Sequence, residues 1–89
     1  MSKNYYLLSI DGKNLEETSE DVYYSVIGDT VHDSYASKVY NKQITIDEVP
    51  EELRNEVSKI VANRINRWGI DFEHQISSDE LQSMVEEVL

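Results

Sequence analysis

The chain has 89 residues, an apolar fraction of 39% and a formal net charge of −10 at pH 7. Its length predicts one domain, residues 1–89, and its apolar content is too high for a disordered chain. The absence of cysteine excludes disulfides, thiolate metal sites and a cysteine nucleophile. Strong acidity disfavours direct binding to nucleic-acid phosphates or to an anionic membrane surface, because both also carry negative charge.

The N-terminal segment predicts a strand. Residues 4–10 form an aromatic and aliphatic run that Asp11-Gly12 stops, which is typical of a strand followed by a tight turn. The first ten residues lack a signal-peptide pattern, and the chain has no run of about 18 apolar residues. We therefore expect a cytoplasmic protein that does not enter a membrane.

A helix is expected over about residues 18–27. Asn14 or Thr18 can cap it, and Gly28 ends it. The β-branched and tyrosine content of residues 22–27 leaves a strand as the alternative for this part. The side chains expected to face the core are those of Val22, Tyr23, Val26 and Ile27.

A second helix is expected from Asp29 to about Asn41, because apolar residues recur there every four positions. A short extended segment follows, and a third helix then begins at Pro50 and ends at Gly69, with acidic residues in its first turn. The expected core positions of the second helix are Val31, Tyr35, Ala36, Val39 and Tyr40, and those of the third are Leu53, Val57, Ile60, Val61, Ile65 and Trp68.

The C-terminal part predicts one strand and one helix. Residues 70–76 alternate between apolar and polar side chains, with His74 on the apolar side, and we expect residues 70–75 to pair with residues 4–10 in a small sheet. Ser77 and Glu80 form a capping box before a helix that presents Leu81, Met84, Val85 and Val88 on one face. The fold class is therefore α+β, a helix-dominated single domain of order β-α-α-α-β-α with a small antiparallel sheet; the alternative is an all-α bundle.

Arg64 is unusual because its position on the third helix falls within the apolar arc. One interpretation is that its side chain passes along the edge of the core to reach solvent. The other is that it is paired to a carboxylate on a neighbouring element, and so holds the acidic C-terminal helix.

No residue pattern in the chain indicates catalysis. His32 lies near Asp29 and Asp33, but a surface polar role is expected for it, and a half-buried core role is expected for His74. The chain has no phosphate-binding glycine loop, no nucleophile elbow and no calcium-loop pattern. We expect no enzyme activity, no cofactor and no metal.

The strongest functional signal is negative charge. Residues 16–33 contain six carboxylates and no lysine or arginine. Acidic residues one turn apart on a helix lie about 5–6 Å from each other, which is comparable to the spacing of successive phosphates. Such a row can occupy the nucleic-acid-binding groove of a basic protein; the alternative is a solvated face that gives solubility. The expected partner-binding residues are Glu16, Glu17, Glu20, Asp21 and Tyr24, followed by Asp79, Glu80, Glu86 and Glu87.

In size and acidity the chain resembles small phage or mobile-element proteins, among them anti-CRISPR and other nucleic-acid-mimicking inhibitors. The segment YASKVYNKQITIDEVPEELRNEVSKIV, residues 35–61, is also similar to short phage proteins found near tail genes. The resemblance implies a non-enzymatic inhibitor that blocks a basic, nucleic-acid-handling host protein. The alternative is a phage structural or assembly accessory protein that self-associates through its tyrosines, with a homodimer as one form.

Overall fold

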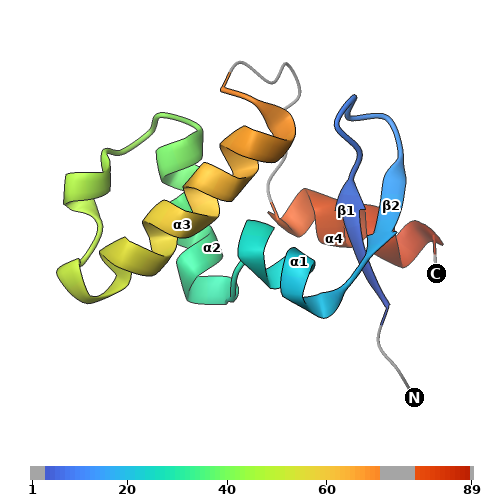
Figure 1. Cartoon of the computed structure of the whole chain (residues 1–89), viewed down its shortest axis with the longest axis horizontal. Helices are drawn as coiled ribbons and strands as arrows, with labels where there is room; N and C mark the ends of the chain where they lie inside the picture. Colours follow the sequence, from blue (N-terminus) through green and yellow to red (C-terminus); the bar gives the residue numbers. More distant parts are fainter. Residues whose placement is uncertain (1–3, 71–77, 89) are drawn as a thin grey trace.

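The computed structural model describes residues 4–70 and 78–88, and it combines a two-stranded hairpin with four α-helices (Figure 1). The helix-dominated α+β class with a small antiparallel sheet is confirmed, and the alternative of an all-α bundle is wrong. The elements are β1 (Tyr5–Leu8), β2 (Leu15–Thr18), α1 (Glu20–Val26), α2 (Thr30–Tyr40), the 3₁₀ helix η1 (Ile46–Glu48), α3 (Glu51–Trp68) and α4 (Ser78–Val88).

The hairpin corrects the expected order of elements. β1 pairs antiparallel with β2, so that Leu8 lies opposite Leu15 and Tyr5 opposite Thr18. Gly12, with a φ of 75°, supplies the turn between them. Neither Asn14 nor Thr18 caps a helix: β2 occupies this segment because its backbone hydrogen bonds go to β1. Residues 71–75, which were expected to pair with β1, lie outside the described residues.

The cap of α1 lies one residue after Thr18, the later of the two expected caps. The Ser19 side chain accepts the N–H of Val22, and Gly28, with a φ of 76°, follows the end of the helix. Val26 and Ile27 are buried as expected, but Val22 is 41% exposed. The reason is that α3 contacts the last turn of α1, whereas Val22 lies one turn earlier.

α2 is rotated about its axis relative to the expected orientation. Asp29, where this helix was expected to start, is its N-cap, and Ala36 and Tyr40 are buried, but Val31 is 55% exposed. Asp33 faces inward instead, because its carboxylate binds an arginine of α3. The following segment is also different, since residues 46–48 form the 3₁₀ helix η1 where an extended segment was expected.

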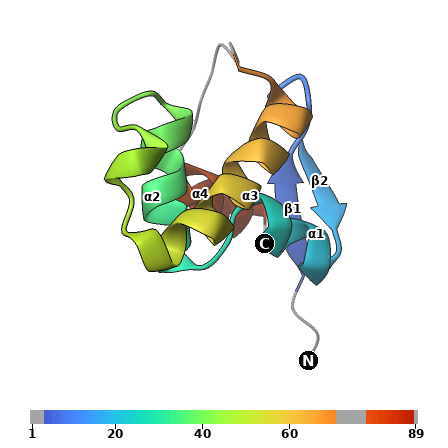
Figure 2. The same cartoon turned by 60° about the vertical axis from the view of Figure 1, so that its left-hand side comes forward.

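α3 is the central element, and it lies between α2 on one side and α1 with the hairpin on the other (Figure 2). It runs from Pro50 to Gly69 as expected, but Ile65 is 36% exposed and does not belong to the core. Apolar side chains form two clusters along it. One contains Leu7, Leu8, Val26, Ile27 and Leu81 and packs against Trp68; the other contains Ala36, Val49, Val57 and Ile60.

Arg64 lies between these clusters and is only 4% exposed. Its Nε donates to Val26 O at 2.7 Å and its Nη2 to Ile27 O at 3.1 Å, which satisfies carbonyls at the end of α1. Nη2 also donates to Asp33 Oδ1 at 2.5 Å. The interpretation that Arg64 reaches solvent is therefore wrong, and its carboxylate partner belongs to α2, not to the C-terminal helix.

α4 packs beside β1 through the face that the sequence indicates. Leu81 and Val85 are buried, and Met84 packs against the first cluster. The structure does not describe residues 71–77, so the expected strand, His74 and the expected cap Ser77 lie outside the described residues. Ile70, the first residue of that expected strand, is described and lies in a bend.

Candidate functional site

The four carboxylates that were expected to face outward together in one row lie on two elements. Glu16 and Glu17 belong to β2, and Glu20 and Asp21 form the first turn of α1; all four are exposed. Successive strand residues point to opposite faces, so Glu16 shares a face with Leu7 and Glu17 does not. The expectation of one helical row is therefore wrong. We call these four residues the β2–α1 acidic surface.

Glu16 differs from the other three members of this surface. Its Oε1 lies 3.1 Å from Arg67 Nη2, and Arg67 Nε also donates to Leu8 O at 3.0 Å. Glu16 thus helps to hold the hairpin against α3. Within residues 4–70 and 78–88, Glu17, Glu20 and Asp21 form no ion pair, so the unbalanced charge of the surface resides on them.

An aromatic cluster adjoins this surface. The rings of Tyr5, Tyr23 and Tyr24 contact one another, with centroids 5.1–5.8 Å apart. Tyr24 is 44% exposed and lies one turn after Glu20, on the same face of α1. Desolvation, a hydrogen bond to Tyr24 and the negative charge of Glu20 together raise the pKa of Tyr5. The carboxylate and the aromatic rings are therefore close neighbours.

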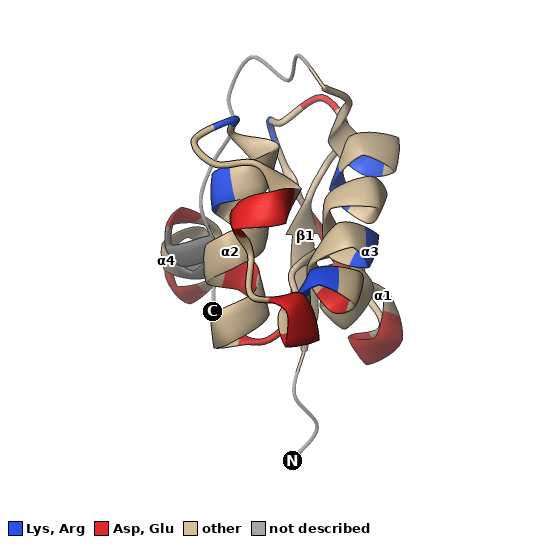
Figure 3. Ribbon diagram, turned by 90° about the vertical axis from the view of Figure 1, so that its left-hand side faces the viewer, with Lys and Arg blue, Asp and Glu red and all other residues tan. Residues whose placement is uncertain are grey.

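A second acidic set lies on α4. Glu80, Glu86 and Glu87 are exposed; Asp79 belongs to the same helix, but its side chain is outside the described part. Figure 3 shows α4 and α1 on either side of β1, each with acidic positions. The two sets therefore do not form one row along a single element.

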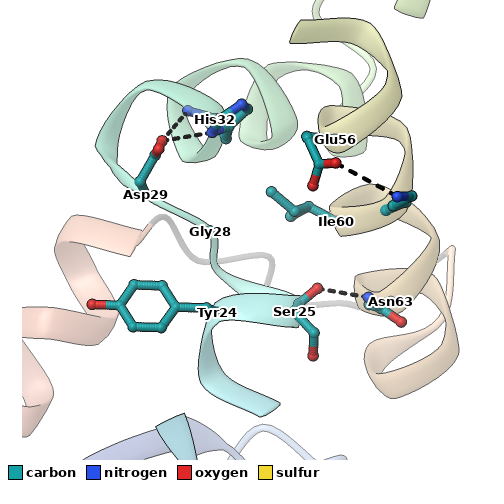
Figure 4. A pocket seen from close by; sticks show the side chains of 9 residues that line it. Tyr24, Ser25, Gly28, Asp29, His32, Glu56, Ile60 and Asn63 are labelled. Carbon is teal, nitrogen blue, oxygen red and sulfur yellow. Dashed lines mark hydrogen bonds and ion pairs between the residues drawn. The ribbon is translucent and has the colours of Figure 1, made fainter. Parts of the chain in front are cut away.

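A pocket of about 390 Å³ opens between the end of α1, the start of α2 and the middle of α3 (Figure 4). At one wall of it the backbone of Gly28 lies close to α3: a Cβ at this position would overlap Ile60 Cδ1, and the φ of 76° also disfavours other residues. Ile60 supplies apolar surface, and polar side chains from three elements surround it. The lining residues are Tyr24, Ser25, Gly28, Asp29, His32, Glu56, Lys59, Ile60 and Asn63.

His32 and Asp29 are hydrogen-bonded to each other at this pocket. Asp29 Oδ1 lies 2.8 Å from both the backbone N and the ring Nδ1 of His32. The backbone hydrogen bond, with the contribution of the ring, lowers the pKa of Asp29. Because an ionised carboxylate only accepts hydrogen bonds, Nδ1 is the donor and carries the proton. The His32 side chain is 22% exposed, which is less than a surface role predicts.

The serine hydroxyl group that lines this pocket is already hydrogen-bonded within α1. Ser25 Oγ already donates to Val22 O, at 2.7 Å. In the part of the chain that the structure describes, no three His, Asp or Glu side chains are grouped to hold a metal ion. The same part contains no helix with the length and apolar character of a membrane span.

Comparisons with protein-family models, with curated proteins and with solved structures gave no match. Sequence reasoning had placed Tyr24 at a binding surface and had noted the acidic neighbours of His32, but it did not join them in one pocket. Ser25, Glu56, Lys59, Ile60 and Asn63 were missed as lining residues. No local pattern signals them, because their proximity depends on how α1 and α2 pack against α3.

The tyrosines make folding sensitive to alkaline pH. Desolvation is the main cause that raises the pKa values of Tyr5, Tyr23 and Tyr40 above the ordinary 10.0. Near pH 10 the folded chain therefore holds more protons than the unfolded chain, and the stability present below that pH is lost as pH rises through the folded-state pKa values. We expect the free energy of unfolding, measured with urea, to fall between about pH 9 and 11.

Tyr23→Phe is the control, because it removes one of these groups while keeping the ring. It should make the decline shallower. A free energy of unfolding that is constant or rises over this pH range would contradict the prediction.

Proposed function

We propose that this chain is a non-enzymatic binding protein whose β2–α1 acidic surface binds a basic protein partner. The observation that carries the proposal is the placement of Glu17, Glu20 and Asp21, which are exposed and unpaired within the described residues, beside the exposed ring of Tyr24. Unpaired charge steers a partner of opposite charge, and tyrosine contributes strongly to binding energy at interfaces.

The partner's surface in this proposal is one that otherwise binds nucleic acid. Carboxylates next to an aromatic ring reproduce the two features such a surface recognises, negative charges and a flat ring on which to stack. In its most specific form the chain is a phage-type inhibitor that acts in the cytoplasm of a host cell. The hydrogen bond of Ser25 Oγ to the backbone supports a binding role over a catalytic one.

The test compares two triple variants with equal changes of charge. One removes the unpaired charges of the acidic surface: Glu17→Gln, Glu20→Gln and Asp21→Asn. The control is Asp47→Asn, Glu51→Gln and Glu52→Gln, at the other end of the molecule (Figure 1). Both sets include two residues from the first turn of a helix, so their effects on helix stability should be similar, a few tenths of a kcal/mol per residue.

Each chain is immobilised and exposed to bacterial lysate at low and high salt. Parent and control should retain the same basic protein at about 0.05 M salt and release it at about 0.5 M, or on addition of duplex DNA, while the surface variant should not retain it. Equal retention by both variants would refute the proposal. An assembly of the chain itself that persists at high salt would favour self-association instead.

A further inference from the structure

The pocket beside Tyr24 is rich in hydrogen-bond acceptors. The Asp29 side chain accepts both of its hydrogen bonds from His32 at Oδ1, and the carboxylate, 60% exposed, has further lone pairs on Oδ2. Because His32 Nδ1 is the donor to Asp29, Nε2 of the neutral ring is an acceptor. Glu56 supplies a second carboxylate, 58% exposed. These acceptors favour a ligand that donates hydrogen bonds.

Charge at the pocket also favours a cation. The cationic side chain among the lining residues is Lys59, and its Nζ lies 3.5 Å from Glu56 Oε1, which offsets its charge. Within the described residues, Asp29 forms no ion pair with a lysine or an arginine. Glu56 and Lys59 offset each other, so any occupant meets the unbalanced negative charge of Asp29, which attracts a cation and repels an anion.

The other lining residues fit a long side chain that consists of methylene groups and ends in a planar group. Ile60, which is 5% exposed, contributes a small apolar part of the floor, and the exposed ring of Tyr24 extends outward from the edge of the pocket, away from Ile60 (Figure 4). A guanidinium stacks on aromatic rings and donates five N–H groups in a plane, without any acceptor. The volume of about 390 Å³ is at the small end of the range for ligand sites, which fits one side chain.

From these features we infer that the pocket binds an arginine side chain of the basic partner. The inference rests on the proposed function and makes it more specific. Tyr24 joins the two sites: it follows Glu20 by one turn on α1 and also lines the pocket. A basic segment crossing Glu20 and Asp21 would therefore bring an arginine to Tyr24 and, through it, to Asp29.

The test uses a defined probe, N-acetyl-arginine N-methylamide, followed by NMR on the full chain. We expect saturable shift changes at the lining residues of the pocket, and weak or no binding of the matched citrulline compound, which lacks the charge. Asp29→Asn and Glu56→Gln should each weaken binding about five- to ten-fold. Asparagine caps helices as well as aspartate does, so α2 should be retained. Glu51→Gln, on α3 but outside the pocket, is the charge-matched control and should change nothing.

Several results would overturn the inference. These are equal binding of the arginine and citrulline compounds, preferred binding of N-acetyl-glutamate N-methylamide, or shifts spread over all exposed carboxylates. Unchanged affinity in both Asp29→Asn and Glu56→Gln would also do so. If the arginine compound does not bind while the surface triple variant still loses the protein partner, the inference about the pocket is wrong and the proposed function is retained. If the arginine compound binds as expected while the triple variant retains the partner, the proposed function is wrong but the pocket is still an arginine-binding site.

Discussion

Replacing Arg64 by methionine is expected to lower the free energy of unfolding by about 3–5 kcal/mol. The side chain is 4% exposed, and it satisfies Asp33 together with the carbonyls of Val26 and Ile27. Methionine fills similar space but donates nothing, so two carbonyls lose this donor and the largely buried Asp33 carboxylate loses its ion pair, keeping, within the described part of the chain, only the hydrogen bond from Ser37 Oγ at 3.3 Å. Since small domains are stable by about 5–15 kcal/mol, the loss should be plain in urea unfolding at neutral pH.

Arg67→Met is the matched control on the same helix. Arg67 also donates to a carbonyl and a carboxylate, but its side chain is 21% exposed and Glu16 is largely in water. We expect a loss of about 1 kcal/mol. The double variant Arg64→Met with Asp33→Asn should lose less than the sum of the single losses, because the two groups are partners. Equal losses for Arg64→Met and Arg67→Met would show that burial of Arg64 contributes nothing.

Ile60→Asp is expected to unfold the chain. Ile60 is 5% exposed and contacts the second apolar cluster, and burying an unpaired carboxylate costs several kcal/mol, comparable to the whole stability. Circular dichroism at neutral pH should show loss of most helical signal. Because Ile60 also lines the pocket, a loss of binding in this variant could not be separated from unfolding. The variant is therefore used to test folding only.

Ile65→Asp makes the same change five positions later and is the control. The sequence predicted both residues as core, but Ile65 is 36% exposed. Its carboxylate would remain in water, so we expect a loss of no more than about 1 kcal/mol, mostly from helix propensity. A cooperative melt of Ile60→Asp near that of the parent would show that α3 does not support the core.

Local signals predicted the helices well and the sheet poorly. Asp29 and Gly69 mark the ends of α2 and α3 because capping and positive φ are properties of the residues themselves. β2 was missed because Leu15–Thr18 contains two glutamates and has little strand preference of its own; its pairing with β1 makes it a strand. The exposure of Val31 was missed for a similar reason, since Asp33 fixes the rotation of α2 through Arg64.

The candidate site was only partly accessible from the sequence. The charge of residues 16–21 is visible in composition, and all four carboxylates are exposed. The ion pair between Glu16 and Arg67 joins residues 51 positions apart in the sequence, and no periodic pattern in the sequence could predict it. The pocket depends on the same kind of long-range packing, because the backbone of Gly28 approaches Ile60 of α3 more closely than a residue with a Cβ could.

The short length of α1 has a consequence for the order of folding. Seven residues are too few for a helix to persist by itself in water, and the carbonyls at its end are held by Arg64, 37 and 38 positions later. α1 should therefore form late, when α3 is already in place. Glu20, Asp21 and Tyr24 then take up their arrangement only once the chain has collapsed around α3. A nascent or partly unfolded chain would carry the same charge without that arrangement. A partner that recognises the arrangement would therefore bind only the folded chain.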